Sequence, residues 1–361
     1  MTRATRAIIN LSALRHNLSI ARRRAPDSRI MAIIKANGYG HGSVTVAQAL
    51  NEVDAFGVAC LDEAITLREA GIAQPIVLLE GAVHAADLNL VRGYQLELVV
   101  HHPAQINLLE QDSGRAIPVW LKLDTGMHRL GIPPGQVAEM LQRLGQLETV
   151  AQPVRLMTHL ANADDRQDNT TSQQLARFDA ATADLKLQTS IANSAGILAW
   201  PDTHRDWVRP GIMLYGVSPF VDSAAAENEL QPVMTLQSEL IAVNRQQQGD
   251  PIGYGGTYRC PADMPVGVIA IGYGDGYPRH APTGTPVLVN GKRVPLIGRV
   301  SMDMICVDLR DCPEAQIGDP VVLWGDDLPV EEIASQAGTI GYELLCQVTQ
   351  RVPFDYQHGI N

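Results

Sequence analysis

The feature that most constrains the fold is a regular alternation of short apolar runs with amphipathic helical segments through the first two-thirds of the chain. The apolar runs lie at residues 30–34, 55–59, 76–79, 96–99, 117–123, 154–158, 190–193 and 207–209. Each run but the last is clearly followed by a segment of helical size. The pattern predicts an α/β fold of the (β/α)8 TIM-barrel type. Periodicity alone leaves a doubly wound open sheet as the alternative.

The pattern changes near residue 230. Residues 233–243 alternate as an extended strand does, and residues 304–309 and 321–324 have the composition of further strands. The runs at 286–289 and 294–297 flank Asn290-Gly291, a hairpin signal because both turn residues must accept positive φ. Only residues 330–337 look helical in this part. We therefore expect two domains, a barrel over residues 1–229 and a mainly β domain over residues 230–361.

Composition excludes several classes of function. Hydrophobic residues make up 45% of the 361 residues and charged ones 19%, which is enough apolar side chain to bury a sizeable core. The net charge of −11 argues against nucleic-acid and anionic membrane partners. No apolar stretch approaches the roughly 18 residues that cross a bilayer.

The cysteines and the N-terminal segment bear on location. The five cysteines lack the spacing of a metal site, so we expect reduced thiols in a cytoplasmic protein and no metal. The first 26 residues hold six arginines and no acid, as a transit peptide does. However, Leu11, Leu14 and Leu18 recur at helical spacing, so we interpret the segment as part of the folded protein.

Two of the four lysines lie where a barrel carries its chemistry. Lys35 ends the first apolar run and Lys122 lies in the fifth. Active sites of barrels lie at the carboxyl ends of the strands. A desolvated lysine there has a lowered pKa and attacks an aldehyde to form a Schiff base. The alternative is a lysine that merely extends its ammonium group to solvent at the barrel rim.

The loops around these lysines favour a phosphate-bearing cofactor. Lys35 opens a polar loop that contains three glycines, at residues 38, 40 and 42. Asn193-Ser194 and Arg209-Pro210-Gly211-Ile212 follow the seventh and eighth strands, where barrels often bind phosphate through free backbone N–H groups. A lysine on the first strand together with a phosphate cradle indicates pyridoxal 5′-phosphate.

Six segments, in order, resemble the alanine racemase family. They are residues 35–42 (KANGYGHG), 123–131 (LDTGMHRLG), 207–216 (WVRPGIMLYG), 252–257 (IGYGGT), 272–279 (GYGDGYPR) and 301–304 (SMDM). The match covers the chain from about residue 7 to residue 353. It departs from the family at Gly38, where alanine is more frequent, and at Ile252, where valine is. Neither change removes a functional group.

The resemblance implies an isomerase that interconverts L-alanine and D-alanine by a two-base mechanism. Lys35 would hold the cofactor as an aldimine and act on one face of the substrate, and Tyr254 from the other subunit of a homodimer would act on the opposite face. A phenol is a base near neutral pH only where cations and hydrogen bonds favour its ionised form. The product would supply D-alanine for peptidoglycan in the cell wall, or the enzyme would consume D-alanine in catabolism. A broad-specificity amino-acid racemase and a non-catalytic cofactor carrier are the alternatives.

The resemblance also assigns the remaining site residues. Arg209 would face the pyridine nitrogen, to which a guanidinium only donates. His159 and Arg129 would surround the catalytic tyrosine, and Lys122 matches a lysine that is carbamylated in some members and orients Arg129. The cofactor-binding set, beside Lys35 and Arg209, comprises Tyr39, Ser194, Gly211, Ile212 and Tyr342. The substrate-binding set comprises Arg129, Met302, Asp303 and Tyr273, and Tyr273 and Tyr342 would narrow the entrance.

Overall fold

A closed parallel barrel forms the first part of the chain. The computed structural model describes residues 4–220 and 223–357. The barrel strands follow one another in sequence order: β2 (Arg29–Ile33), β3 (Ala55–Val58), β4 (Ile76–Leu78), β5 (Glu97–Val100), β6 (Ile117–Lys122), β7 (Val150–Met157), β8 (Thr189–Ser190) and β9 (Trp207–Val208). The barrel closes where Ile30 pairs with Val208. This confirms the predicted barrel and excludes the open sheet.

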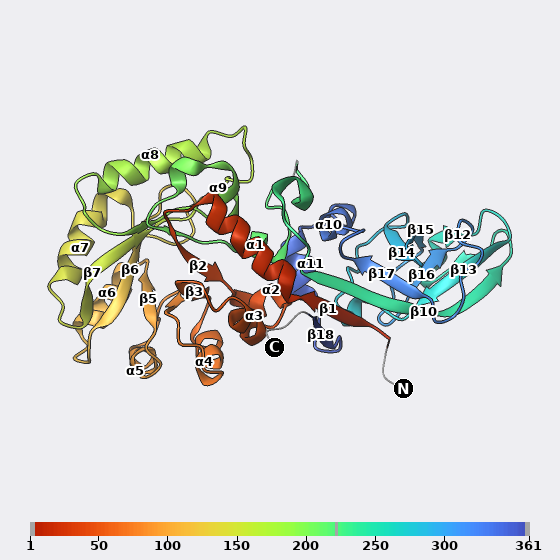
Figure 1. The fold of residues 1–361 in the computed structure, drawn as a ribbon, viewed down its shortest axis with the longest axis horizontal. Helices are drawn as coiled ribbons and strands as arrows, with labels where there is room; N and C mark the ends of the chain where they lie inside the picture. Colours follow the sequence, from red (N-terminus) through yellow and green to blue (C-terminus); the bar gives the residue numbers. More distant parts are fainter. Residues whose placement is uncertain (1–3, 221–222, 358–361) are drawn as a thin grey trace.

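Helices cover the outside of the barrel (Figure 1). They are α1 (Leu11–Arg24), α3 (Ser43–Ala49), α4 (Leu61–Glu69), α5 (Ala85–Gly93), α6 (Pro103–Glu110), α7 (Val137–Gly145), α8 (Thr170–Thr182) and α9 (Ser194–Ala199). Helix α1 begins where the Asn10 side chain accepts hydrogen bonds from the amides of Ser12 and Ala13. It buries Leu14 and Leu18, which confirms that this segment belongs to the folded protein.

An eight-stranded sheet forms most of the second domain. The strands are β10 (Met234–Gln246), β13 (Met264–Ile269), β14 (Pro286–Val289), β15 (Lys292–Ile297), β16 (Ile305–Asp308), β17 (Pro320–Trp324), β18 (Phe354–Gln357) and β1 (Arg6–Asn10). The predicted hairpin joins β14 to β15, and φ is +50° at Asn290 and +75° at Gly291. Helix α10 (Val330–Ala337) has its predicted bounds. A second helix, α11 (Gly341–Gln347), was not predicted.

Strand β1 links the two parts of the chain. It pairs antiparallel with β10, where Ala7 lies opposite Leu236, and parallel with β18, where Ala7 lies opposite Phe354. The predicted domain boundary after residue 229 stays a proposal. Strand β1, which was assigned to the barrel domain by that boundary, belongs to the sheet of the second domain (Figure 1). The strands that pair with β1 are remote from it in sequence, so the residues of β1 alone do not indicate this pairing.

Helix α11 brings the second domain to the carboxyl end of the barrel. Leu344 and Leu345 are buried in the common core. A Cβ on Gly40 would overlap the Leu345 carbonyl, so glycine permits the close approach of the two segments. The short helix was hard to predict because it begins at a glycine and is fixed by this packing. Among the described residues, no helix is both long and apolar enough to cross a membrane.

Candidate active site

A left-handed turn follows the first barrel strand and begins next to Lys35. φ lies between +50° and +63° at its four residues, Ala36, Asn37, Gly38 and Tyr39. Residues other than glycine, and to a lesser extent asparagine, avoid this conformation, which costs about 1–2 kcal/mol per residue in a left-handed helix. The Gly38 amide closes the turn by donating to the Ile34 carbonyl, 2.9 Å away. Contacts with the rest of the fold must therefore stabilise the turn.

Four cationic side chains gather at the carboxyl end of the barrel: Lys35, Lys122, Arg129 and Arg209. Burial lowers the pKa of Lys122 to about 8, and the other three cations act in the same direction. Asp124 opposes them, but one of its oxygens accepts from the amides of Gly126 and His128. The cluster therefore has an excess of positive charge and suits an anionic ligand.

Neutral acceptors hold the buried guanidinium of Arg209. It donates to Ser190 Oγ at 2.7 Å and to the carbonyl oxygens of Thr158 at 2.6 Å and Ile191 at 3.2 Å. Ser190 in turn donates to the Trp207 carbonyl, 2.9 Å away. Burial lowers the pKa of Arg209 to about 10, so the side chain is still charged at neutral pH. The arginine is thus fixed as a permanent donor.

His159 is the neutral member of the cluster. Its Nδ1 lies 3.4 Å from an amino group of Arg209, and because arginine only donates, Nδ1 is the acceptor and Nε2 carries the proton. Burial lowers the pKa of His159 well below its ordinary value, and Arg209, Lys122, Arg129 and Lys35 add to the effect. His159 therefore presents an N–H donor from Nε2.

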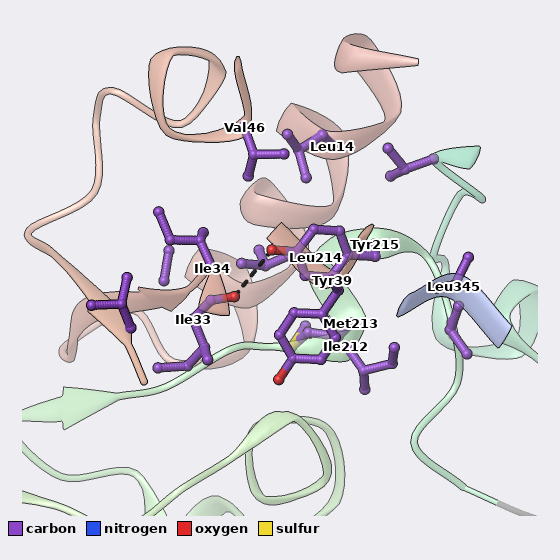
Figure 2. Close-up of a cluster of buried hydrophobic side chains, with 14 of the residues drawn as sticks. Leu14, Ile33, Ile34, Tyr39, Val46, Ile212, Met213, Leu214, Tyr215 and Leu345 are labelled. Carbon is purple, nitrogen blue, oxygen red and sulfur yellow. Dashed lines mark hydrogen bonds between the residues drawn. The ribbon is translucent and has the colours of Figure 1, made fainter. Parts of the chain in front are cut away.

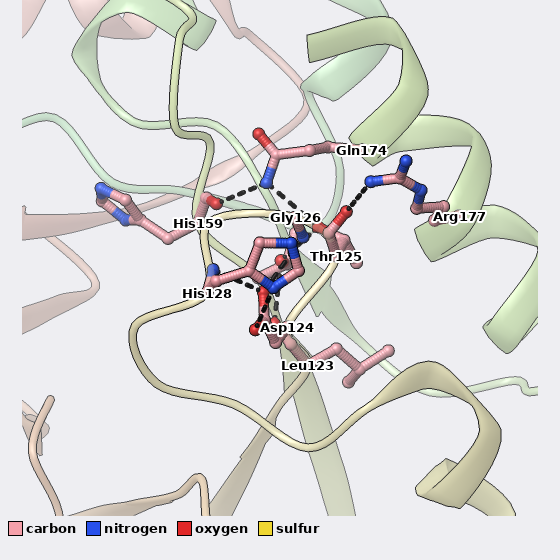
Figure 3. A network of polar contacts seen from close by, with 9 residues as sticks. Leu123, Asp124, Thr125, Gly126, His128, His159, Gln174 and Arg177 are labelled. Carbon is pink, nitrogen blue, oxygen red and sulfur yellow. Dashed lines mark hydrogen bonds and ion pairs between the residues drawn. The ribbon is translucent and has the colours of Figure 1, made fainter. Parts of the chain in front are cut away.

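Helix α8 holds the segment after strand β6 at Thr125 and the backbone of His159 (Figure 3). Gln174 donates to the His159 carbonyl at 3.0 Å and to Thr125 Oγ1 at 3.3 Å. Arg177 donates to the Thr125 carbonyl at 3.0 Å. Figure 3 shows the His159 ring directed away from this network. One helix thus ties the backbone of His159 to Thr125, which lies four residues before Arg129.

An aromatic cluster holds Tyr39 (Figure 2). Its ring stacks on Tyr215 at 4.8 Å between centroids, and Tyr342 of α11 lies 6.1 Å away on the same basis. The Tyr215 hydroxyl donates to the Ile33 carbonyl at 3.1 Å. A Cβ on Gly211 would lie 2.8 Å from the Tyr39 hydroxyl oxygen. Burial raises the pKa of Tyr39, so its hydroxyl keeps its proton.

Ser194 joins Tyr39 and Gly211 at the same place. Its hydroxyl oxygen accepts from the amides of Gly211 at 2.9 Å and Met213 at 3.3 Å. Residues 4–220 and 223–357 offer no acceptor for the hydroxyl hydrogens of Ser194 and Tyr39. The hydroxyl groups of Ser194 and Tyr39 are therefore two available donors close to Gly211, which has no side chain to fill the space beside them. Such an arrangement suits a phosphate group. The residues present at this place, Tyr39, Ser194 and Gly211, fit the phosphate of pyridoxal 5′-phosphate.

The remaining predicted residues lie on the second domain, in two groups. Tyr254 lies between β11 (Pro251–Ile252) and β12 (Tyr258–Arg259), with 69% of its surface exposed. Figure 1 shows β12 at the end of the domain remote from the barrel. Tyr273 and Met302 lie together, because the Tyr273 amide donates to the Ser301 carbonyl and that of residue 274 to the Met302 carbonyl.

Asp303 belongs to the second group. It pairs with Arg351 at 2.6 Å, and Arg351 also lies 3.6 Å from the buried carboxylate of Asp275. Tyr273 and Met302 are 41% and 52% exposed. Tyr254, which lies next to β12, is on a part of the second domain remote from α2 (Lys35–Gly40), the element that begins at Lys35.

Sequence reasoning missed several residues that support the site. Ser190 and Thr158 hold Arg209, Gln174 holds His159, and Tyr215 holds Tyr39. Ser190 and Thr158 both lie at carboxyl ends of barrel strands, so the rule that selected Lys35 applied to them as well. No local signal marks Gln174. Among the described residues, no group of three His, Cys, Asp or Glu side chains is arranged to hold a metal ion.

Two family models match the chain: residues 9–219 match "Alanine racemase, N-terminal domain" and residues 233–356 match "Alanine racemase, C-terminal domain". The chain is 52% identical over 360 residues to alanine racemase of Coxiella burnetii strain RSA 493, covering 98% of this chain and 99% of the relative. It is 56% identical over 348 residues to that of Nitrosococcus oceani, covering 96% and 98%. The crystal structure of biosynthetic alanine racemase from Pseudomonas aeruginosa superimposes with a TM-score of 0.96 at 46% identity, covering 99% of this chain and all of the other.

Proposed function

The chain belongs to the alanine racemase family, and we propose that it interconverts L-alanine and D-alanine with pyridoxal 5′-phosphate bound at the carboxyl end of the barrel. Family membership rests on matches that cover nearly the whole chain. The observation that carries the cofactor proposal is the meeting of Tyr39, Ser194 and Gly211, where two hydroxyl donors surround a space that a Cβ would fill.

The proposed roles of the cofactor-binding residues rest on the family resemblance, and their positions support these roles. Tyr39, Ser194 and the backbone at Gly211 would hold the phosphate, Lys35 would bond to the aldehyde carbon, and Arg209 would donate to the ring nitrogen. When bound, the cofactor supplies an electron sink that acidifies the hydrogen on the substrate α-carbon. Because Arg209 only donates and stays charged at neutral pH, it would leave the ring nitrogen without a proton.

Inversion at the α-carbon requires that one group removes a proton from one face and another group delivers a proton to the opposite face. We assign these roles to the Lys35 amine and to the hydroxyl of Tyr254 of the partner subunit. The His159 Nε2–H is a suitable donor for the tyrosine oxygen, since Arg209 occupies Nδ1. Arg129, Met302, Asp303 and Tyr273 are proposed to bind the substrate or border its entrance.

We also propose a homodimer with shared active sites, and the position of Tyr254 supports this proposal. Its side chain is largely exposed, on a loop of the second domain remote from the barrel of its own chain (Figure 1). A two-fold dimer would let each second domain reach the barrel of the other subunit. Tyr273 and Met302 are also exposed, and we propose that they border the shared site.

Circular dichroism of alanine solutions tests the proposed reaction. The enzyme with added cofactor should abolish the ellipticity of L-alanine and of D-alanine alike, because enantiomers have equal free energies and the equilibrium mixture is racemic. The apo-protein should leave both signals unchanged. Turnover that is independent of the cofactor, or none with it, would contradict the proposal.

A further inference from the structure

We propose that Glu63 is a positioning residue for Lys35, because its carboxylate holds the backbone on both sides of the gap where the first two barrel strands separate. The inference rests on the proposed role of Lys35 as the lysine that bonds to the cofactor. Glu63 lies on helix α4, outside all six segments that resemble the family.

The pairing of β2 with β3 breaks at Lys35. The strands run in regular parallel register up to Ile33 opposite Gly57, and the Ile34 amide donates to the Gly57 carbonyl at 3.0 Å. A regular parallel ladder would continue with the Ala59 amide donating to the Ile34 carbonyl. That carbonyl instead accepts from Gly38, which closes the left-handed turn. The turn therefore removes the acceptor that the Ala59 amide would have had.

Glu63 supplies the missing acceptors. Its Oε2 accepts from the Ala59 amide at 2.8 Å, and its Oε1 accepts from the Ala36 amide at 2.6 Å. An ionised carboxylate accepts at both oxygens, and hydrogen bonds to a charged acceptor are stronger than neutral ones. One side chain thus satisfies an amide from each of the two separated strands.

The location of Glu63 explains why it reaches both amides. Helix α4 starts at Leu61, directly after the strand end that carries Ala59, and Glu63 is in its first turn. Side chains on a helix lean towards its N-terminus, so this carboxylate turns back over the strand ends. Asp62 shares the first turn but its side chain is exposed. Asp62 therefore makes the same general helix-terminus contribution without these two contacts.

The contact with Ala36 acts directly on Lys35. The Ala36 N–H lies in the planar peptide that also contains the Lys35 carbonyl, so fixing it fixes the backbone rotation on the carboxyl side of Lys35. Tyr39, at the other end of the turn, is held separately by its stacking on Tyr215. Loss of the Glu63 carboxylate should therefore disturb Lys35 more than the phosphate contact of Tyr39.

Two ligands separate these effects in the apo-protein. Pyridoxine 5′-phosphate has the ring and phosphate of the cofactor but an alcohol in place of the aldehyde, so it reports binding without a bond to lysine. Pyridoxal 5′-phosphate reports the rate of covalent attachment to Lys35, measured by borohydride trapping and mass spectrometry. The variants are Glu63→Gln and the matched control Asp62→Asn, each of which removes one charge from the same helical turn.

In Glu63→Gln one backbone amide faces an NH2 group instead of an oxygen. We expect the attachment rate constant to fall about tenfold and the affinity for pyridoxine 5′-phosphate to change less than about twofold, as for loss of one charge-assisted hydrogen bond. Hydrogen exchange should rise in the peptides that contain Ala36 and Ala59. Asp62→Asn should match the wild type in all three measurements.

Equal attachment rates in Glu63→Gln and the wild type would overturn the inference. A parallel loss of both ligands with faster exchange throughout the chain would also overturn it, because that result indicates a general structural role. Failure of the wild type to attach pyridoxal 5′-phosphate to Lys35 would instead overturn the proposed function.

Discussion

The hydroxyl of Tyr39 lies against the α-carbon of Gly211, so closely that a Cβ on that glycine would come within 2.8 Å of the phenol oxygen. Tyr39 follows the first barrel strand and Gly211 follows the last. Closure of the barrel through the pairing of β2 with β9 brings them together. The cradle proposed for the cofactor phosphate is thus a direct consequence of barrel closure.

Gly211→Ala should weaken the binding of pyridoxine 5′-phosphate about tenfold or more, because an added methyl group in a packed site typically costs about 1–3 kcal/mol. Titration of the apo-protein followed by fluorescence measures the affinity. Gly145→Ala is the control, because a Cβ there meets no atom within 4 Å. Unchanged affinity in Gly211→Ala would remove Tyr39 and Gly211 from the proposed cradle.

Borohydride reduction of the holoenzyme should place the cofactor on Lys35. Lys35 lies where strands β2 and β3 separate, whereas Lys122 is the buried last residue of β6. Peptide mapping by mass spectrometry distinguishes the two lysines. A label on Lys122 would show that the assignment of the cofactor lysine is wrong.

Lys122 should form a carbamate with carbon dioxide. Only the neutral amine reacts, and the pKa of about 8 makes it accessible near neutral pH. A carbamate would also place a negative charge among the surrounding cations. With ¹³C-bicarbonate, the wild type should show a carbamate resonance that is absent in Lys122→Gln and weakens as the pH falls below 8. Identical spectra for the two proteins would exclude the modification.

His41 should make the fold sensitive to acid. Burial lowers its pKa to about 4 from an ordinary value of 6.5, although hydrogen bonds to the Tyr39 and Gly38 carbonyls oppose the shift. Because the folded-state pKa is the lower one, the contribution of His41 to stability is present above pH 6.5 and is lost as the pH falls towards 4. The shift corresponds to about 3 kcal/mol.

His41→Asn keeps a donor for the carbonyls but does not titrate. Denaturant unfolding of the apo-protein across this range should therefore show a shallower loss of stability in the variant than in the wild type. Parallel pH profiles for the two proteins would show that His41 does not contribute to the acid sensitivity.

Local patterns predicted the barrel, the hairpin and helix α10, because each depends on periodicity or on turn residues close in sequence. Strand β1 was missed because its partner residues are remote, as with Ala7 opposite Leu236. The left-handed turn was missed for a different reason. Ala36 and Tyr39 favour other conformations as isolated residues, and tertiary contacts impose positive φ on them.

The candidate site likewise contains residues that the sequence indicated and residues that only the structure reveals. Motif resemblance indicated the residues proposed to touch cofactor or substrate, such as Lys35 and Arg209, and their placement is compatible with those roles. The residues that hold them, such as Ser190 and Gln174, belong to no such motif. Their partners become visible only once the strands and helices are assembled, because each contact joins segments that are separate in sequence.

Complementation between two inactive variants tests the shared active site most directly. Lys35→Ala and Tyr254→Phe should each lose most racemase activity as homodimers. After subunit exchange, each heterodimer should contain one site with both defects and one with neither, so activity should return to about half that of the wild type per dimer, by site counting. If mass spectrometry shows exchange but no activity returns, the two groups belong to one chain and the inter-subunit site is contradicted.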